Sequence, residues 1–202
     1  MRLYLLRHGE TDWNRDRRVM GQTPVPLSER GRAMVAALAS ALDREKIPVI
    51  YSSTVARAAE SSAILAAAWA AEVREEPRLN ESHFEGWVGK TYEDLADDPN
   101  FILYQTTPTR ASFSTHEGIA DIQARALAAV ARILADAAAR KLERAAALSH
   151  SDIIKPVLTH YLGMDLDAMH RLSLAPASAS LIDLGEEPPR IRYINFVPWK
   201  WR

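Results

Sequence analysis

The apolar residues Leu3-Tyr4-Leu5-Leu6 run directly into the polar stretch Arg7-His8-Gly9-Glu10-Thr11. A short apolar run at the start of a chain is typical of a strand that is buried on both faces. The residues after it include an arginine and a histidine, which bind anions and transfer protons. Ligands of open α/β sheets bind beyond the carboxyl ends of the strands, so we expect a functional site here.

The composition is that of an ordinary globular chain. Of its 202 residues, 48% are hydrophobic and 25% are charged, which excludes a largely disordered chain and a coiled-coil rod. Lys and Arg number 25 and Asp and Glu 26, for a net charge of -1, which argues against nucleic acid as the main partner. Cysteine is absent, so disulfides, thiolate zinc sites and cysteine nucleophiles are excluded.

The apolar segments are too short for a membrane protein. No apolar run approaches the roughly 18 residues of a membrane span, and the N-terminal run is too short for a signal peptide. We therefore expect a cytoplasmic protein with no membrane partner. The length favours a single domain over residues 1–202, and a homodimer remains open.

Strands and helices are predicted to alternate along most of the chain. Strands are predicted at residues 3–6, 49–51 and 145–149, and helices at residues 29–45, 54–71, 120–140 and 152–162. We expect Pro156 to lie in or near the first turn of the last helix, because a proline further along would kink the helix. This alternation predicts a three-layer α/β sandwich, with a mostly parallel sheet and helices on both faces. Residues 178–184 and 191–196 flank a Gly- and Pro-rich turn, which predicts a hairpin and an antiparallel edge strand.

One stretch fits neither a helical nor a strand period. Residues 97–115 contain Pro99 and Pro108, and we expect a loop there. Long loops in compact domains often cover a substrate. We therefore expect residues 81–118 to form an insertion that covers the substrate.

Polar residues follow each predicted parallel strand. Arg7 and His8 follow the first strand, Arg57 lies shortly after the second, and His150 follows the third. Two guanidinium groups would repel a divalent cation, so we expect neither a metal nor another cofactor. Arginine offers a rigid fork of donors to phosphate oxygens, so this set favours a phosphate site. One imidazole could attack phosphorus while the other stabilises the transferring group.

The stretch from Leu6 to Asn14 resembles the Arg-His-Gly signature of the histidine phosphatase superfamily, in its phosphoglycerate-mutase-like branch. The resemblance continues in order through Gly21-Gln22, Pro26 to Gly31, Ser52-Ser53 with Arg57-Ala58, Leu79-Asn80-Glu81 with Phe84, Trp87 and Gly89, and Leu148-Ser149-His150. It covers nearly the whole chain.

The resemblance implies a phosphate pocket. His8 matches the nucleophile that becomes phosphohistidine, and Arg7, Arg57 and His150 match the other members of the pocket, with Asn14 as a polar phosphate contact. The two arginines would disfavour protonation of His8. They would also stabilise charge on the equatorial phosphoryl oxygens.

The resemblance also implies an acid. Glu81 matches the residue that protonates the leaving oxygen and later activates water. Its neighbours Leu79, Phe84 and Trp87 would desolvate the carboxyl group and raise its pKa. Glu85 and Glu93 are the nearby alternative carboxylates.

The activity that the resemblance implies is that of a metal-independent phosphomonoesterase acting through phosphohistidine on a small phosphorylated metabolite. A cofactor-dependent phosphoglycerate mutase is the alternative, and a non-catalytic phospho-ligand-binding module is a third hypothesis. Dedicated mutases of the family are longer and have a tyrosine where Phe84 stands, which favours the phosphatase. The chain departs from the family's pattern after the second histidine, where Ser151 and Asp152 replace a glycine-rich step.

Other conspicuous residues are interpreted as structural or exposed. We expect His83 and His116 to be exposed, His160 and His170 to be structural, and Arg15, Arg17 and Arg18 to form a solvated cluster, with steering of an anionic substrate as the alternative. We expect Trp199 and Trp201 to pack on the sheet.

Overall fold

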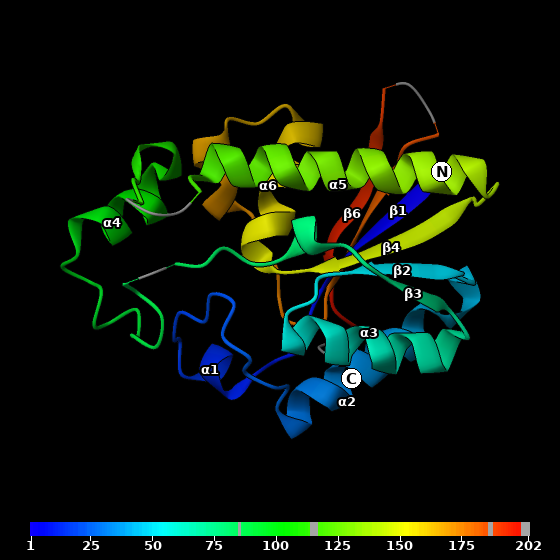
Figure 1. Cartoon of the computed structure of the whole chain (residues 1–202), viewed down its shortest axis with the longest axis horizontal. Helices are drawn as coiled ribbons and strands as arrows, with labels where there is room; N and C mark the ends of the chain where they lie inside the picture. Colours follow the sequence, from blue (N-terminus) through cyan, green and yellow to red (C-terminus); the bar gives the residue numbers. More distant parts are fainter. Residues whose placement is uncertain (85, 114–116, 186–187, 199–202) are drawn as a thin grey trace.

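The structure is a computed structural model that describes residues 1–84, 86–113, 117–185 and 188–198. Its strands form one six-stranded sheet in the order β3-β2-β4-β1-β5-β6 (Figure 1). The strands are β1 (Arg2–Arg7), β2 (Val49–Ser52), β3 (Glu72–Glu75), β4 (Arg144–Ser149), β5 (Ala179–Asp183) and β6 (Arg190–Phe196). The first four are parallel, whereas β5 runs antiparallel to β1 and β6 antiparallel to β5. The predicted mostly parallel sheet with an antiparallel edge is therefore confirmed.

Helices cover both faces of this sheet. The α-helices are α1 (Asp12–Arg15), α2 (Glu29–Leu42), α3 (Ala56–Trp69), α4 (Pro99–Thr106), α5 (Ile119–Ala139) and α6 (Ser151–Leu162). Short 3-10 helices are η1 (Asp43–Glu45), η2 (Pro77–Leu79), η3 (Pro108–Arg110) and η4 (Leu166–Arg171). The pair α2 and α3 lies on one face, and α5 and α6 lie on the other (Figure 1). Among the described residues, no helix combines the length and apolarity needed to cross a membrane.

The central strand β1 is apolar because it has a core on each side. Leu3 and Leu5 pack in the cluster that includes α5 and α6, whereas Tyr4 and Leu6 pack in the cluster that includes α2 and α3. Successive side chains of a strand point to opposite faces, so a strand between two helical layers needs apolar residues throughout. This packing places the polar residues at the carboxyl end of β1 at the edge of the core.

Among the strands and α-helices, β3, α1 and α4 were not predicted. The edge strand β3 has the sequence Glu72-Val73-Arg74-Glu75, whose polar residues gave no strand signal. Helix α4 lies where residues 97–115 were expected to be a loop, and that prediction was wrong. The side chain of Asp98 accepts hydrogen bonds from the backbone N–H groups of the first turn, and Pro99 stands at the first helical position. Both are helix start signals.

The prediction for Pro156 was also wrong. It lies in the second turn of α6 rather than in the first. A proline there removes the N–H group that would bond to the carbonyl of Asp152. The ring is buried, and the carbonyl of Pro156 accepts a hydrogen bond from Nε2 of Gln123 at 2.9 Å. At this position α6 therefore contacts α5.

The loop after β1 is held against the start of α2. The hydroxyl of Ser28 accepts a hydrogen bond from the backbone N–H of Gly31 at 2.9 Å, which caps α2. A Cβ atom at Gly31 would lie only 2.0 Å from the carbonyl oxygen of Glu10, and one at Gly9 only 2.7 Å from the carbonyl oxygen of Gly31. The two backbones touch, so the position of His8 depends on the absence of side chains here.

Gly31→Ala should therefore destabilise the protein. We expect a loss of about 2 kcal/mol or more in the free energy of unfolding in urea, because the new methyl group overlaps backbone rather than a flexible side chain. The matched control is Gly118→Ala, where the nearest heavy atom to the new Cβ is 3.7 Å away. There the loss should stay below about 1 kcal/mol. Equal losses in the two variants would contradict the close approach.

Candidate active site

Three parallel strands bring the predicted site residues to one edge of the sheet. Strand β4 lies between β1 and β2, and all three point the same way. His8 follows β1, His150 caps α6 directly after β4, and Arg57 lies in the first turn of α3 after β2. The rings of His8 and His150 have their centroids 5.1 Å apart. The structure therefore brings together residues far apart in the sequence.

The hydrogen bonds of His8 define the proton on its ring. Nδ1 of His8 lies 2.7 Å from the carbonyl oxygen of Gly9, which can only accept. Nε2 lies 3.1 Å from Nε of Arg57, which can only donate. Nδ1 therefore carries the hydrogen, and the lone pair of Nε2 accepts the hydrogen bond from Arg57.

The guanidinium group of Arg57 is fully buried and held by backbone. Nη2 donates to the carbonyl oxygen of Gly21 at 2.8 Å, and Nη1 donates to that of Thr23 at 3.4 Å. Nη2 also lies 3.9 Å from Oε2 of Glu81. Burial lowers the pKa of Arg57 to about 10, an effect that Glu81 opposes, so the group stays charged at neutral pH.

His150 is oriented by residues that the site prediction did not include. Oδ1 of Asn80 accepts hydrogen bonds from the backbone N–H of Thr54 at 2.8 Å and from the hydroxyl of Ser53 at 2.9 Å. Ser53 has thereby used its only hydrogen, so its oxygen must accept from Nε2 of His150, 2.9 Å away. Nδ1 of His150 is left as the free ring nitrogen, buried and without a hydrogen-bond partner in the described part of the chain. Ser53 and Asn80 appeared in the sequence only as parts of a motif.

Both imidazoles are held neutral. Burial lowers the pKa of His8 well below its usual value, and the charges of Arg57 and Arg7 lower it further. The pKa of His150 is lowered for the same reasons, burial first and then Arg57. Burial and nearby cations both disfavour an imidazolium. His8 is therefore an unprotonated base at neutral pH.

Glu81 has the opposite shift. Its side chain is buried, Oε1 accepts a hydrogen bond from the N–H of Ser82 at 3.1 Å, and Oε2 lies 3.8 Å from Nδ1 of His150. Burial raises the pKa of Glu81 to about 8, with the charge of Asp152 adding to the rise and Arg57 opposing it. At neutral pH the site thus contains a protonated carboxyl group beside unprotonated imidazoles.

Arg7 and Asn14 also lie at the site. Nη1 of Arg7 donates to the carbonyl of Leu174, while its buried Nε has no hydrogen-bond partner among the described residues. Oδ1 of Asn14 accepts from the N–H of Thr11 at 3.0 Å, which anchors the side chain at the start of α1. Both residues line the same cavity as His8 and Glu81.

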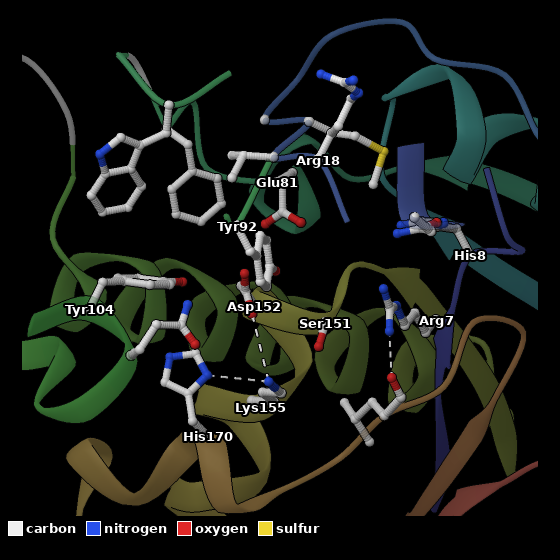
Figure 2. Close-up of a pocket in the computed structure, with 18 of the residues that line it drawn as sticks. Arg7, His8, Arg18, Glu81, Tyr92, Tyr104, Ser151, Asp152, Lys155 and His170 are labelled. Carbon is white, nitrogen blue, oxygen red and sulfur yellow. Dashed lines mark hydrogen bonds and ion pairs between the residues drawn. The ribbon is translucent and has the colours of Figure 1, made fainter. Parts of the chain in front are cut away.

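This cavity has a volume of about 340 Å³ and opens beside His8 (Figure 2). Several of its lining residues were not predicted as site residues: Arg18, Tyr92, Tyr104, Asp152, Lys155 and His170. His170 was expected to be structural, and the structure places it at the cavity instead. Glu93 is exposed and is not among the cavity residues. Glu85, His116, Trp199 and Trp201 lie outside the described residues.

The site holds few metal ligands. Across residues 1–84, 86–113, 117–185 and 188–198, no group of three or more His, Cys, Asp or Glu side chains could hold a metal ion. The charged groups nearest His8 are the guanidinium groups of Arg7 and Arg57. Such an arrangement fits an anion.

The family model of the histidine phosphatase superfamily (branch 1) matches residues 3–197. The chain belongs to this superfamily. The family and the fold inferred from the Arg-His-Gly motif are thereby confirmed. The structure of Bacillus stearothermophilus YhfR matches with a TM-score of 0.89 and 29% identity, over 97% of this chain and 97% of that chain.

Named relatives of this chain include phosphatases and a probable mutase. Glucosyl-3-phosphoglycerate phosphatase of Mycobacterium tuberculosis is 35% identical over 137 residues, which are 66% of this chain and 60% of that relative. The match therefore spans less than two thirds of the relative's length. Phosphoserine phosphatase 1 of Hydrogenobacter thermophilus is 29% identical over 96% of this chain and 92% of the relative. A probable phosphoglycerate mutase, GpmB of an Enterobacter species, is 29% identical over 93% of this chain and 87% of the relative.

The raised pKa of Glu81 should be measurable as a dependence of stability on pH. Its pKa is about 8 in the folded chain, against 4.5 for an ordinary glutamate. Between these values the folded chain binds a proton that the unfolded chain has released, so stability falls as pH rises. Glu81→Gln removes this loss. We expect its melting temperature to exceed that of the wild type by about 2–4 °C or more at pH 8, and by less at pH 5.

The control for this measurement is Glu93→Gln, which neutralises an exposed carboxylate. It should change the melting temperature by a similar small amount at both pH values. If Glu81→Gln showed the same stability difference at pH 5 and pH 8, the pKa of Glu81 would not be raised.

Proposed function

We propose that the protein is a metal-independent phosphomonoesterase that acts on a small phosphorylated metabolite through a phosphohistidine at His8. The observation that carries the proposal is the orientation of His8. Its Nδ1 is bound to the carbonyl oxygen of Gly9, and its Nε2 lone pair lies beside the guanidinium group of Arg57. A nucleophilic nitrogen is thus adjacent to a cation that can hold a phosphoryl group.

In the first step, Nε2 of His8 attacks phosphorus and the bond from phosphorus to the leaving oxygen breaks. Arg7 and Arg57 neutralise the phosphoryl oxygens, and Asn14 contacts them at the cavity wall. A phosphate dianion would raise the pKa of His150 and allow its Nδ1 to donate to a phosphoryl oxygen. Glu81 gives its proton to the leaving oxygen, which departs as an alcohol.

In the second step, water attacks phosphorus and the bond from phosphorus to Nε2 breaks. The carboxylate of Glu81 takes the proton of the attacking water, which returns it to its protonated form. Inorganic phosphate then leaves and His8 is neutral again. The same residue therefore acts first as an acid and then as a base.

The likeness to GpmB favours a second candidate function, a phosphoglycerate mutase. A mutase uses the same phosphohistidine but returns the phosphoryl group to the bound product. It would have to accept the carboxylate of phosphoglycerate in a cavity where Lys155 already lies 3.9 Å from Asp152. Dependence on a bisphosphoglycerate primer would identify the mutase. A homodimer and a cytoplasmic location stay predictions.

The first prediction of the proposal concerns the nucleophile. His8→Ala should lower turnover of p-nitrophenyl phosphate by at least about 10³-fold, because the covalent route is lost. Rapid acid-free quenching of the wild type, followed by mass spectrometry, should find an acid-labile phosphate on His8. All assays contain a chelator, so that a metal-dependent route does not contribute.

The matched control is His160→Ala, which removes an exposed histidine from α6. It should retain wild-type turnover. Wild-type turnover by a folded His8→Ala variant would overturn the proposal.

A further prediction concerns Glu81 as the acid. General acid catalysis typically contributes about 10²–10⁴-fold, and it matters most for a poor leaving group such as an alkoxide. Glu81→Gln should therefore slow phosphorylation of His8 by an alkyl phosphate far more than by p-nitrophenyl phosphate. The measurement is the pre-steady-state burst, since steady-state turnover also includes the hydrolysis of phosphohistidine. Equal slowing with both substrates would count against Glu81 as the acid.

A further inference from the structure

The cavity extends past Glu81 to a wall that the proposed phosphoryl transfer does not use (Figure 2). Its polar residues are Tyr104, Asp152, Lys155 and His170, and we call them the distal wall. They come from α4, α6 and η4. Three separate elements therefore place polar side chains around the space that the leaving group would occupy.

The charges of the distal wall cancel within the wall. Nζ of Lys155 lies 3.9 Å from Oδ1 of Asp152 and 3.4 Å from Nδ1 of His170. Because an ammonium group only donates, Nδ1 of His170 accepts, and the ring is neutral with its hydrogen on Nε2. Burial also lowers the pKa of His170, and Lys155 lowers it further against the charge of Asp152. One carboxylate and one ammonium group remain, with no net charge.

The same wall contains buried polar atoms without partners. The hydroxyl of Tyr104 and Nε2 of His170 form no hydrogen bond of normal geometry among the described residues. Burial, and after it the charge of Asp152, raise the pKa of Tyr104 well above its usual value. Tyr104 is only 3% exposed, and its hydroxyl faces the Asp152 side chain in Figure 2. Buried polar groups nearly always form hydrogen bonds. These two atoms therefore suit a ligand that supplies the missing partners.

Aromatic rings lie beside these polar groups. Phe84 and Trp87 line the cavity, with ring centroids 5.4 Å and 5.8 Å from that of Tyr104. Apolar ring surface next to a few fixed donors and acceptors is typical of small-molecule sites. The C–H groups of a sugar or polyol could pack on the rings while its hydroxyl groups reach the polar atoms.

We propose that the distal wall binds the hydroxyl groups of an uncharged, polyhydroxylated leaving group, so that the substrates are phosphomonoesters of sugars or polyols. This inference rests on the phosphoryl transfer proposed above. A hydroxyl group can donate to Asp152 and accept from Lys155, and therefore leaves their ion pair intact. A carboxylate that paired with Lys155, or an ammonium group that paired with Asp152, would have to compete with this ion pair. Arg18 lies beyond Glu81 on the opposite side of the cavity (Figure 2), where it donates to the carbonyl of Gly89.

The test compares two esters with similar leaving oxygens. Hexose 6-phosphate and ethyl phosphate both release a primary alkoxide, but only the hexose has further hydroxyl groups. The wild type should prefer hexose 6-phosphate in kcat/KM by about 10²-fold or more, because a site with buried polar groups rejects a ligand that leaves them unpaired.

Two variants assign this preference to the wall. Asp152→Asn and Tyr104→Phe should each lower the ratio of the two kcat/KM values by about tenfold. The charge of Asp152 also raises the pKa of Glu81. That change alters kcat/KM for both esters by the same factor, so it leaves the ratio unchanged. The control is Asp43→Asn, which removes a carboxylate that is 54% exposed in η1 and should leave the ratio unchanged.

The possible failures are distinguishable. A phosphohistidine burst with p-nitrophenyl phosphate, but no preference for hexose 6-phosphate, would overturn this inference and leave the proposed function intact. A preference for phosphoserine or 3-phosphoglycerate over hexose 6-phosphate would overturn it as well, because both leaving groups are charged. If Asp152→Asn and Tyr104→Phe lowered kcat/KM by the same factor for both esters, the two residues would have only a structural role. If no substrate gave a burst, the proposed function itself would fail, and this inference with it.

Discussion

The buried guanidinium group of Arg57 connects the segments that build the site. It reaches Nε2 of His8, the carbonyl oxygens of Gly21 and Thr23, and the carboxyl group of Glu81. A buried cation without partners is strongly destabilising, so these segments must close around it for the chain to fold. Gly21 has a φ of +51°, and a Cβ atom there would lie 2.2 Å from the carbonyl oxygen of His83. Only glycine lets this carbonyl reach Arg57 while the loop touches the segment that carries Glu81.

The burial of the site also determines the protonation of the groups around Arg57. Desolvation favours the neutral form of every titratable group nearby, and the fixed arginine charges add to this effect for the imidazoles. Near neutral pH the site therefore contains neutral His8, neutral His150 and protonated Glu81, together with the two positive charges of Arg7 and Arg57. A phosphomonoester at neutral pH carries close to two negative charges. The charges of site and ligand then nearly cancel, which favours binding of a phosphate dianion; in the proposed mechanism the bound dianion raises the pKa of His150, which takes up a proton at Nδ1.

The sequence predicted the sheet and the phosphoryl side of the site because both depend on the ends of parallel strands. Apolar runs such as residues 3–6 identify strands with a core on each side, and the carboxyl ends of such strands meet in space. Arg7, His8 and His150 could therefore be assigned to one site from the sequence alone. Ser53 was missed as a partner of His150, because its role depends on a hydrogen bond to Asn80 that no periodic pattern encodes.

The same reasoning explains what the sequence could not predict. Helix α4 is short, and its start signals, Asp98 and Pro99, stand within a segment without a clear period. Strand β3 is a polar edge strand, whose pairing with β2 depends on backbone hydrogen bonds rather than on apolar side chains. His170 reaches the cavity from a 3-10 helix that follows α6. Such contacts depend on how distant segments pack, and a single sequence carries no direct signal for them.

The two sides of the cavity are therefore under different constraints. The phosphoryl side is built on strand ends and a helix start whose backbone positions the whole fold determines. The distal wall is built on side chains from α4, α6 and η4. Because α6 begins directly after His150, the residue at position 152 is carried into the cavity by the helix that also fixes the second imidazole. A side chain can change at position 152 without moving the backbone of His150, so the distal wall can vary independently of the residues around His8.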